Sequence, residues 1–378
     1  MDFSYSEVQL MLQDSVQKFV QKSYDHDTRT KIVDSEDGYS KENWQLFAEL
    51  GWLAVPFTEE EGGLGGSAVD LIVMMEEFGK ANLVEPFTAT AVLGGGLIAE
   101  LAEGTRKTEL IEQVVTGSLQ LACAYAESGS RFNLGKVTTT AANEGNNIVI
   151  NGNKIAVLNA SNADKILLVA REYGTDTDAE GISIFLVDTN TEGLAITPFT
   201  TFDGKKSSEV LFENVRVPES ARLGSSGQAL DALQKIVDRA TVGVSAEAVG
   251  ALESLLKKTV EYSKTRKQFG TAIGTFQALQ HRMADMFIEC QLARSIVVMA
   301  AMQLDGSADE LEKTKAVSAA KSRVGRAIRH VGQESIQIHG GIGMTDELDV
   351  GHLFKRVTAI DIMFGNADYH TERFASFQ

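Results

Sequence analysis

Two short segments near the C-terminus carry residues suited to binding a phosphorylated ligand. Residues 262–281 include Arg266, whose planar guanidinium presents several donors in a geometry that matches phosphate oxygens. Residues 333–345 include Gly340 and Gly341, which let the backbone approach a phosphate closely and donate N–H groups to it. Each feature has a simpler alternative, a surface ion pair for the arginine and an interhelical turn for the glycines. Together the two segments predict an anion site.

Acidic and imidazole side chains supply the candidates for proton transfer. Glu247 lies among small and apolar residues, so we expect a buried carboxylate with a raised pKa or a charged partner. The alternative to a base is an ion pair within a helical bundle. Asp238 precedes it on the same predicted helix. His339 and His370 have the chemistry of general bases, and we assign both to supporting or surface roles. No metal site is predicted.

Hydrophobic periodicity indicates the elements that must position these residues. Apolar side chains recur at helical spacing in residues 1–118 and again in residues 225–378. Long helices are expected at 68–79, 229–265, 274–304 and 308–335, with another beginning near 366.

Residues 119–224 change to short β-rich runs separated by turn residues. Strands are expected at 136–140, 147–150, 154–158, 165–169, 182–187 and 209–212. Asn151-Gly152 stands between two of these runs and predicts a two-residue hairpin. Short strands at this spacing predict a small barrel or sandwich.

Composition limits the function classes. A net charge of −17 over 378 residues argues against non-specific nucleic-acid binding, which requires a basic surface. No signal peptide and no apolar run of about 18 residues is recognised, so no membrane association is expected and the cytoplasm is the default compartment. Cys123 and Cys290 both lie in apolar surroundings and are expected to be buried, inert thiols.

The order of short motifs resembles the acyl-CoA dehydrogenase family over nearly the whole chain. The motifs are Trp44-x-x-Phe-Ala-Glu-Leu-Gly-Trp52, Glu61-Gly62-Gly63, Glu76-Glu77-Phe78-Gly79, Asn151-Gly152-x-Lys154, Ala163-Asp164, Arg266-x-Gln268-Phe269-Gly270, Phe276-Gln277, Met283-Ala284-Asp285-Met286 and Gln337-x-His339-Gly340-Gly341-x-Gly343. The resemblance implies an α+β fold with an N-terminal helical domain (1–118), a middle β-barrel or sandwich domain (119–224) and a C-terminal four-helix bundle (225–378).

The resemblance also implies FAD, an acyl-CoA substrate and an electron-transfer flavoprotein as electron acceptor. The residues that it assigns to FAD are Arg266, Phe269, Gln277, Gln337, Gly340, Gly341, Ala126 and Ser130. The FAD reached by the C-terminal residues belongs to a neighbouring subunit, so an oligomer is implied. Ser130, Asp238 and Thr241 are assigned to substrate. The flavin carries the redox chemistry, and the protein supplies geometry and electrostatics.

The chain departs from the family where the family places its base. Phe364, before Gly365, stands at the position of the catalytic glutamate, and Ala240 stands at the alternative base position. Glu247 is about 10 Å along the helix from Ala240, and Asp238 points to another side of the helix. The backbone N–H of Phe364 remains as a donor for the thioester oxygen. In the flavin-binding segments, Ala126 and Leu158 replace hydroxyl-bearing residues.

Four interpretations follow from this resemblance and these departures. The first is a subunit of a heteromeric acyl-CoA dehydrogenase of the bacterial small-subunit type, which works with a second dehydrogenase-like chain in a heterotetramer. The second is a homotetrameric dehydrogenase with a displaced base, Glu247 or Asp238. The third is a flavoprotein of the same fold with another reaction, such as a desulfinase. The fourth is a non-catalytic assembly subunit.

Overall fold

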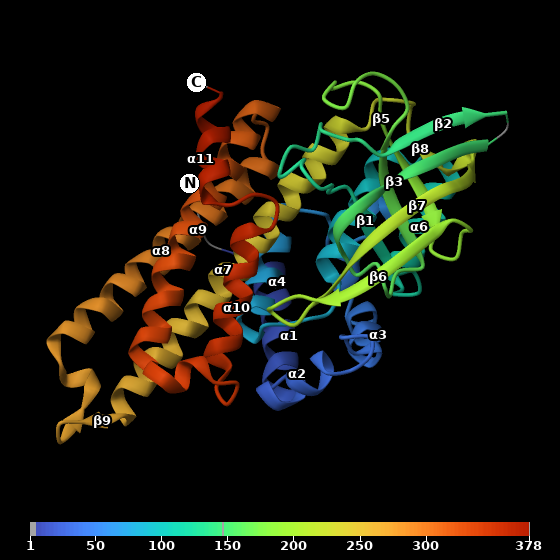
Figure 1. Ribbon diagram of the computed structural model, residues 1–378. Coiled ribbons are helices and arrows are strands. Elements are labelled where there is room, and N and C mark those ends of the chain that lie inside the picture. Colours follow the sequence, from blue (N-terminus) through green and yellow to red (C-terminus); the bar gives the residue numbers. More distant parts are fainter. Residues whose placement is uncertain (1–4, 146, 378) are drawn as a thin grey trace. The chain divides into compact units, whose positions relative to one another are not determined.

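The computed structural model describes residues 5–145 and 147–377, which form two compact units (Figure 1). The helical unit comprises Met1–Lys31, Ala68–Leu83 and Thr241–Gln378, and the sheet unit comprises Ile32–Ser67 and Val84–Ala240. Helix α7 (Leu230–Thr265) begins in the sheet unit and continues in the helical unit. The expected boundaries at residues 118 and 224 stay predictions.

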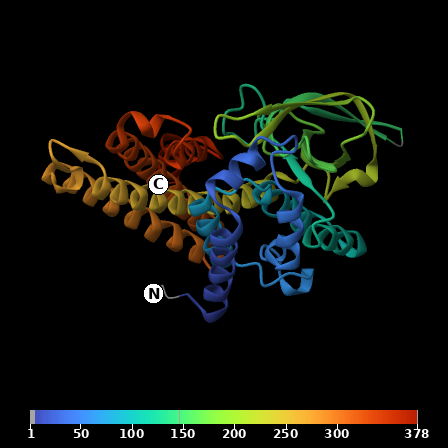
Figure 2. The ribbon, with the colours of Figure 1, turned by 90° about the horizontal axis from the view of Figure 1, so that it is seen from below.

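The helical unit is built mainly from long helices. Its other helices are α1 (Glu7–Ser23), α2 (His26–Val33), α4 (Ala68–Ala81), α8 (Gln277–Asp305), α9 (Glu310–His339), α10 (Asp349–Ile362) and α11 (Ala367–Ala375). Asp309 accepts from the Glu312 N–H at the start of α9, and Asn366 accepts from the Tyr369 N–H at the start of α11. Helix α9 packs against α8, α10 and α11 (Figure 2). The five helices expected from periodicity are confirmed, whereas α10 was not predicted.

Glycines allow α4 and α7 to pack closely. A Cβ on Gly79 would lie 1.8 Å from the Glu247 carbonyl oxygen, and one on Gly250 would lie 1.8 Å from that of Glu76. Neither position accepts a side chain without separating the two helices.

Helix α8 has an apolar surface that the unit leaves exposed. Phe287, Ile288 and Leu292 are 54%, 52% and 49% exposed. By length and composition alone, α8 is the one described helix that qualifies as a membrane span. The sequence-based criterion missed it because charged residues interrupt the apolar run. One of them, Glu289, pairs with Arg323 of α9 at 2.6 Å, as expected of a helix within a protein bundle.

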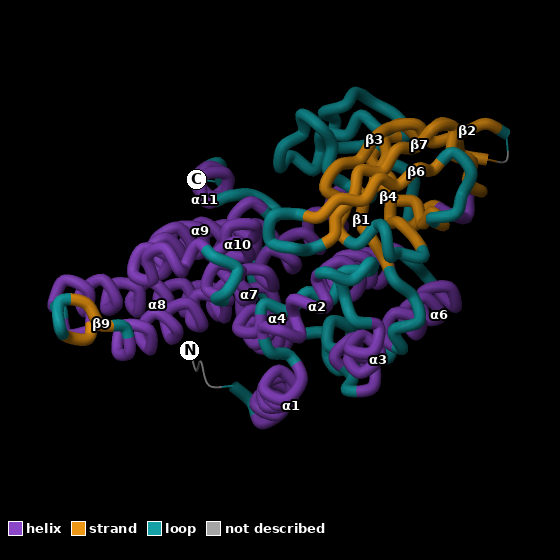
Figure 3. The backbone as a smooth tube through the Cα atoms, turned by 60° about the horizontal axis from the view of Figure 1, so that its bottom comes forward, coloured by secondary structure: helices purple, strands orange, loops and turns teal. Residues whose placement is uncertain are grey.

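The sheet unit folds around one eight-stranded sheet (Figure 3). Its strands are β1 (Leu121–Ala124), β2 (Thr140–Glu144), β3 (Asn147–Leu158), β4 (Lys165–Arg171), β5 (Ile182–Asp188), β6 (Leu194–Thr200), β7 (Lys206–Pro218) and β8 (Arg222–Leu223). Its helices are α3 (Lys41–Glu49), α5 (Gly96–Leu101) and α6 (Gly104–Val115), with a π-helical segment η3 (Thr88–Gly95) before α5. The strand order is β6-β7-β3-β2-β4-β5-β8, and β1 pairs with β4 in parallel.

One face of the sheet covers a buried core. Alternate residues of β4, namely Ile166, Leu168 and Ala170, lie in one buried cluster with residues from β1, β2, β3, β5 and β7. A shared core on one face of these strands is what the predicted barrel or sandwich requires. Strands β1 and β6 were not predicted. The run expected at 136–140 is wrong in its placement, because β2 begins only at Thr140.

The hairpin predicted at Asn151-Gly152 is wrong. Strand β3 runs through both residues, and its pairing with β7 shifts register between Ile150 and Gly152, as at a β-bulge. The glycine is needed for close approach, because a Cβ there would lie 2.4 Å from Thr139 Oγ1. The hairpin in this region joins β2 to β3, with Glu144 facing Asn147.

Candidate functional site

The ends of α7 and α9 lie side by side in the helical unit and hold the predicted anion site. The Tyr262 hydroxyl donates to the His339 carbonyl oxygen at 3.3 Å, and the two rings stack with centroids 4.4 Å apart. Arg266 follows Tyr262 by one helical turn, and Gly340 follows His339 directly. The structure therefore brings together the two segments that the sequence singled out.

The polar side chains of this surface are exposed to solvent. Arg266, Gln277 and Gln337 are exposed, and none of these side chains makes a hydrogen bond or ion pair with another described residue. Phe269 is 94% exposed, has a positive φ of 54° and stands between the two-residue strands β9 (Lys267–Gln268) and β10 (Thr271–Ala272). The exposed ring and the exposed donors leave this surface open to a group from outside this unit.

The two glycines fit the close approach of a phosphate. Gly340 has a φ of 67°, and a Cβ on Gly340 or Gly341 would meet nothing within 4 Å. Packing within the chain therefore does not explain why residue 341 is a glycine. Together with the cation at Arg266, this open backbone fits the diphosphate of a dinucleotide such as FAD.

The turn after α10 holds the residue at the expected base position. Phe364 has a φ of 59° and Gly365 a φ of 113°, so two successive residues have positive φ. A Cβ on Gly365 would lie 2.4 Å from the Tyr369 ring, which restricts that position to glycine. The backbone geometry of the turn is thus specified even though its side chain is apolar.

A buried lysine contacts this turn and was missed by sequence reasoning. Lys321 of α9 donates to the carbonyl oxygens of Ile360, Asp361 and Gly365 at 2.7, 2.9 and 2.8 Å. Its side chain is fully buried, and burial lowers the pKa of Lys321 to about 7. His370 contacts the Phe364 carbonyl oxygen through Nε2 at 3.1 Å, and burial lowers its pKa to about 3.

The candidate base Glu247 is paired. Its carboxylate accepts two hydrogen bonds from Arg356 of α10, at 2.6 Å and 2.8 Å, and both side chains are 3% exposed. A bidentate guanidinium occupies the lone pairs that a base would use. This geometry favours the ion-pair alternative stated for Glu247.

The other predicted polar residues lie on helices. On α7, Asp238 is 4% and Thr241 1% exposed, and Ala240 is also buried. The His339 Nδ1 lies 2.8 Å from the Ser335 carbonyl oxygen, and burial lowers the pKa of His339. These contacts favour a supporting role for His339. The substrate contacts assigned to Asp238 and Thr241 stay predictions.

In the sheet unit, a buried ion pair holds the loop that follows β1. Lys154 Nζ lies 2.6 Å from the Glu127 carboxylate and 3.3 Å from the Tyr125 carbonyl oxygen. Burial opposes ionisation of Glu127, but Lys154 and hydrogen bonds from Thr138 and Thr139 outweigh it and lower the pKa of Glu127 to about 2. Burial lowers the pKa of Lys154 to about 8 despite its partner. Lys154 belongs to a quoted motif, but nothing in the spacing indicated this pair.

Ser130 and Ala126 shape the same loop. The Ser130 hydroxyl donates to the Glu127 carbonyl oxygen at 2.9 Å and accepts from the Glu127 N–H at 3.2 Å, and Ser130 is only 8% exposed. The Ala126 carbonyl oxygen accepts from the Ile155 N–H at 2.9 Å. Their assignment to cofactor, and that of Ser130 to substrate, stay predictions.

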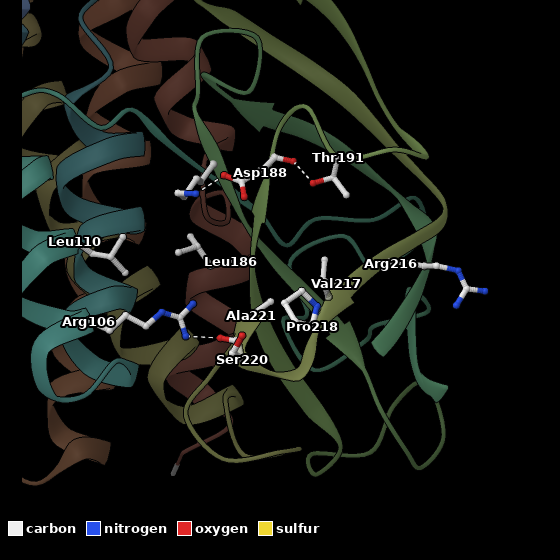
Figure 4. Close-up of a pocket in the computed structure, with 11 residues that line it drawn as sticks. Arg106, Leu110, Leu186, Asp188, Thr191, Arg216, Val217, Pro218, Ser220 and Ala221 are labelled. Carbon is white, nitrogen blue, oxygen red and sulfur yellow. Dashed lines mark hydrogen bonds and ion pairs between the residues drawn. The ribbon is translucent and has the colours of Figure 1, made fainter. Parts of the chain in front are cut away.

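A separate cavity of about 440 Å³ lies between α6 and the sheet (Figure 4). Arg106 at its wall donates to the Ser220 carbonyl oxygen, and Lys165 pairs with Asp188. Arg216 points away from the cavity and pairs with Glu144. None of the predicted site residues lines it, and these cations already have partners within the unit.

Comparisons with known proteins agree along the whole chain. Three family models match it: "Acyl-CoA dehydrogenase, N-terminal domain" over residues 6–118, the middle domain over 122–215 and the C-terminal domain over 228–377. The chain is 30% identical to "Probable acyl-CoA dehydrogenase YngJ" of Bacillus subtilis (strain 168), covering 97% of each chain. It is 27% identical to "Caffeyl-CoA reductase-Etf complex subunit CarC" of Acetobacterium woodii, covering 96% of each. The solved "Tcur3481-Tcur3483 steroid ACAD" shares 27% identity at a TM-score of 0.87, covering 98% of this chain and 97% of that one.

Proposed function

This chain belongs to the acyl-CoA dehydrogenase family, and we propose that it is a subunit that grips the FAD of a partner chain and carries no base of its own. The family are FAD-dependent oxidoreductases acting on CH–CH donors. One residue carries the proposal: Phe364, which the family resemblance assigns to the base position, lies in a turn where it and Gly365 both have positive φ.

The surface at the ends of α7 and α9 is the proposed FAD grip. Arg266 would hold the diphosphate, Gly340 and Gly341 would admit it, and Phe269 would cover a ring edge. Gln277 and Gln337 would donate to the remaining polar groups. When bound, FAD accepts the hydride from the substrate β-carbon. The ring and the donors are exposed on this unit, which is consistent with a flavin held by another subunit, as the family resemblance implies.

The substrate is an acyl-CoA thioester. The backbone N–H of Phe364 would donate to the oxygen of a thioester bound at this turn. Phe364 has no group that accepts a proton, so removal of the α-proton falls to a carboxylate of the partner chain at the partner's own site. We place the complex in the cytoplasm.

The exposed apolar face of α8 supports association with a second chain. Phe287, Ile288 and Leu292 form part of it, and apolar surface of this kind is typical of a protein interface. The relative named as an Etf complex subunit supports an electron-transfer flavoprotein as the electron acceptor. The steroid dehydrogenase whose name joins two designations supports a heteromeric assembly.

A homotetramer with a displaced base is the weaker alternative, because the Glu247 carboxylate is held by Arg356. The desulfinase and scaffold alternatives have no observation in their favour. The exposed FAD grip argues against a scaffold without cofactor.

The test is anaerobic flavin reduction by a panel of acyl-CoAs, with and without a co-expressed second dehydrogenase-like chain. We expect FAD binding and rapid flavin bleaching only with both chains. Arg266→Ala should release FAD from the complex, whereas Arg216→Ala, which alters a surface arginine of the sheet unit, should not. Rapid bleaching by this chain alone would overturn the proposal.

A further inference from the structure

Building on the proposed function, which places a thioester against the turn after α10, we propose that Lys321 is a positioning residue for that turn. Its ammonium contacts three carbonyl oxygens at 2.7–2.9 Å, and those carbonyls flank Phe364 on both sides. By fixing this backbone, Lys321 orients the peptide group that faces the thioester oxygen.

The end of α10 explains why a cation stands there. The last carbonyls of a helix have no partner within it, and they form the negative end of the helix dipole. Ile360 and Asp361 lie in this last turn, since α10 ends at Ile362. A lysine ammonium has three N–H donors, so three carbonyl acceptors satisfy it completely.

The third bond makes the contact more than a helix cap. Gly365 lies beyond the turn, so a single nitrogen joins the end of α10 to the far side of the turn. The Cα path between them contains Phe364 at a φ of 59°, a conformation that a bulky residue adopts only where surroundings impose it. Lys321 supplies part of that constraint.

His370 supplies a second part. Because the Phe364 carbonyl oxygen can only accept, the imidazole Nε2 carries the proton, and Nδ1 faces Ser318 Oγ at 3.4 Å. Ser318 and Lys321 lie one turn apart on α9, so α9 serves as the template for the turn. The carbonyls of Ile360, Asp361, Phe364 and Gly365 are thereby all held.

The consequence is a chain that binds a thioester carbonyl without a carboxylate beside it. A family site that lost only its base would be free to lose this geometry as well. Here the Lys321 ammonium and the neutral His370 imidazole hold the geometry of the turn through its backbone carbonyls, without using the side chain of residue 364.

The experiment measures binding by the purified full-length chain, so that a partner's sites do not contribute. Calorimetry would compare octanoyl-CoA with octyl-CoA, the thioether that lacks the carbonyl oxygen. We expect the wild type to prefer the thioester by about 3- to 10-fold, the factor that one neutral hydrogen bond contributes. Lys321→Met should abolish this preference and leave the thioether affinity unchanged.

Two further variants separate positioning from general stability. Val317→Ala, a core truncation on the same helix, should lower the melting temperature and keep the preference. His370→Phe should reduce the preference, and it replaces Lys321→Met if the latter does not fold. If neither folds, isotope-edited infrared spectra of wild-type-bound octanoyl-CoA decide, and a thioester carbonyl frequency unshifted from water overturns the inference.

The possible failures are distinguishable. Absence of binding of either ligand by the wild type contradicts the thioester site that the proposed function assigns to this turn, whereas the FAD grip is tested separately by flavin reduction with both chains. A preference that survives in folded Lys321→Met, or is undiminished in His370→Phe where that variant replaces it, overturns only the role of Lys321.

Discussion

Two fully buried lysines, one in each unit, support the two loops to which the sequence assigns chemistry, and they are neutralised in different ways. In the sheet unit, Lys154 faces the Glu127 carboxylate at 2.6 Å behind the loop after β1. In the helical unit, Lys321 faces three carbonyl oxygens behind the turn after α10. The charge of Lys154 is compensated by the opposite charge of Glu127, whereas the charge of Lys321 is stabilised by the dipoles of three carbonyl groups.

The difference bears on what each loop tolerates. Removing one member of a buried ion pair leaves the other charge without compensation, so such a pair ties its two segments together strongly. Removing a cation from a ring of carbonyls leaves only neutral acceptors. The loop after β1 should therefore be the more sensitive of the two to a single substitution.

Glu127→Gln should have the largest effect on stability. It leaves the Lys154 ammonium buried beside a neutral amide, and breaking a buried pair in this way costs about 3–5 kcal/mol. Urea unfolding measures the loss. The double variant Glu127→Gln with Lys154→Met should recover part of it, because the uncompensated charge is gone. A single-variant loss below about 1 kcal/mol would break the comparison.

Lys321→Met should come second. The substitution leaves three carbonyl oxygens without donors, but it also removes the penalty of burying a cation. We expect a loss of about 2 kcal/mol, within the range for unsatisfied buried polar groups. Urea unfolding of this variant beside Glu127→Gln gives the comparison directly. A loss of stability greater than that of Glu127→Gln would contradict the predicted order of the two lysine sites.

The sequence predicted the long helices because apolar side chains recur along them at helical spacing, and at α9 the local cap Asp309 adds to this signal. It did not predict β6, because this strand is largely exposed and contains Pro198, so the alternation between core and solvent is limited to its first half, where Leu194 and Ile196 pack against the core. Asn151-Gly152 was misread as a turn because the glycine serves close packing against Thr139.

Whether a site residue could be predicted depends on whether its contacts are close to it in the sequence or far from it. The motif residues Arg266 and Gly340 could be singled out because their chemistry is local and their side chains, or lack of them, face outward. Lys321 could not, since a lysine in an amphipathic helix usually indicates a solvated face and its acceptors lie 39 to 44 residues away.

The pH dependence of stability should distinguish the two lysines. Burial lowers the pKa of Lys321 to about 7 and that of Lys154 to about 8, against about 10.4 in the unfolded chain. The unfolded state then binds more protons in this interval, so stability rises with pH, by at most about 1.4 kcal/mol per pH unit for each lysine. Lys321→Met should flatten the curve from about pH 7, and Lys154→Met from about pH 8.

Below neutral pH His370 contributes in the same direction as His339, whose pKa is also lowered by burial. The pKa of His370 is lowered to about 3 by burial and by the nearby Lys321, against about 6.5 when unfolded. The unfolded state takes up the proton first, so stability falls as pH drops from 6.5 toward 3. Urea midpoints between pH 4 and pH 10 test both limbs, with His370→Phe as the variant that should have a shallower acid limb. A wild-type curve that is flat across pH 7–10 would contradict the lysine assignments.

The smallest effects on stability should come from two hydrogen bonds next to the buried lysines, one to Glu127 and one to His370. Thr138 Oγ1 donates to the ionised Glu127 carboxylate at an exposed position, and Ser318 Oγ faces the neutral His370 ring at 3.4 Å. Bonds to charged acceptors are the stronger class, so Thr138→Val should cost about 1 kcal/mol and Ser318→Ala about 0.5 kcal/mol. Chemical denaturation of both variants on one wild-type background resolves this difference. Equal losses would mean that the charge of Glu127 strengthens its contact with Lys154 but not its hydrogen bond from Thr138.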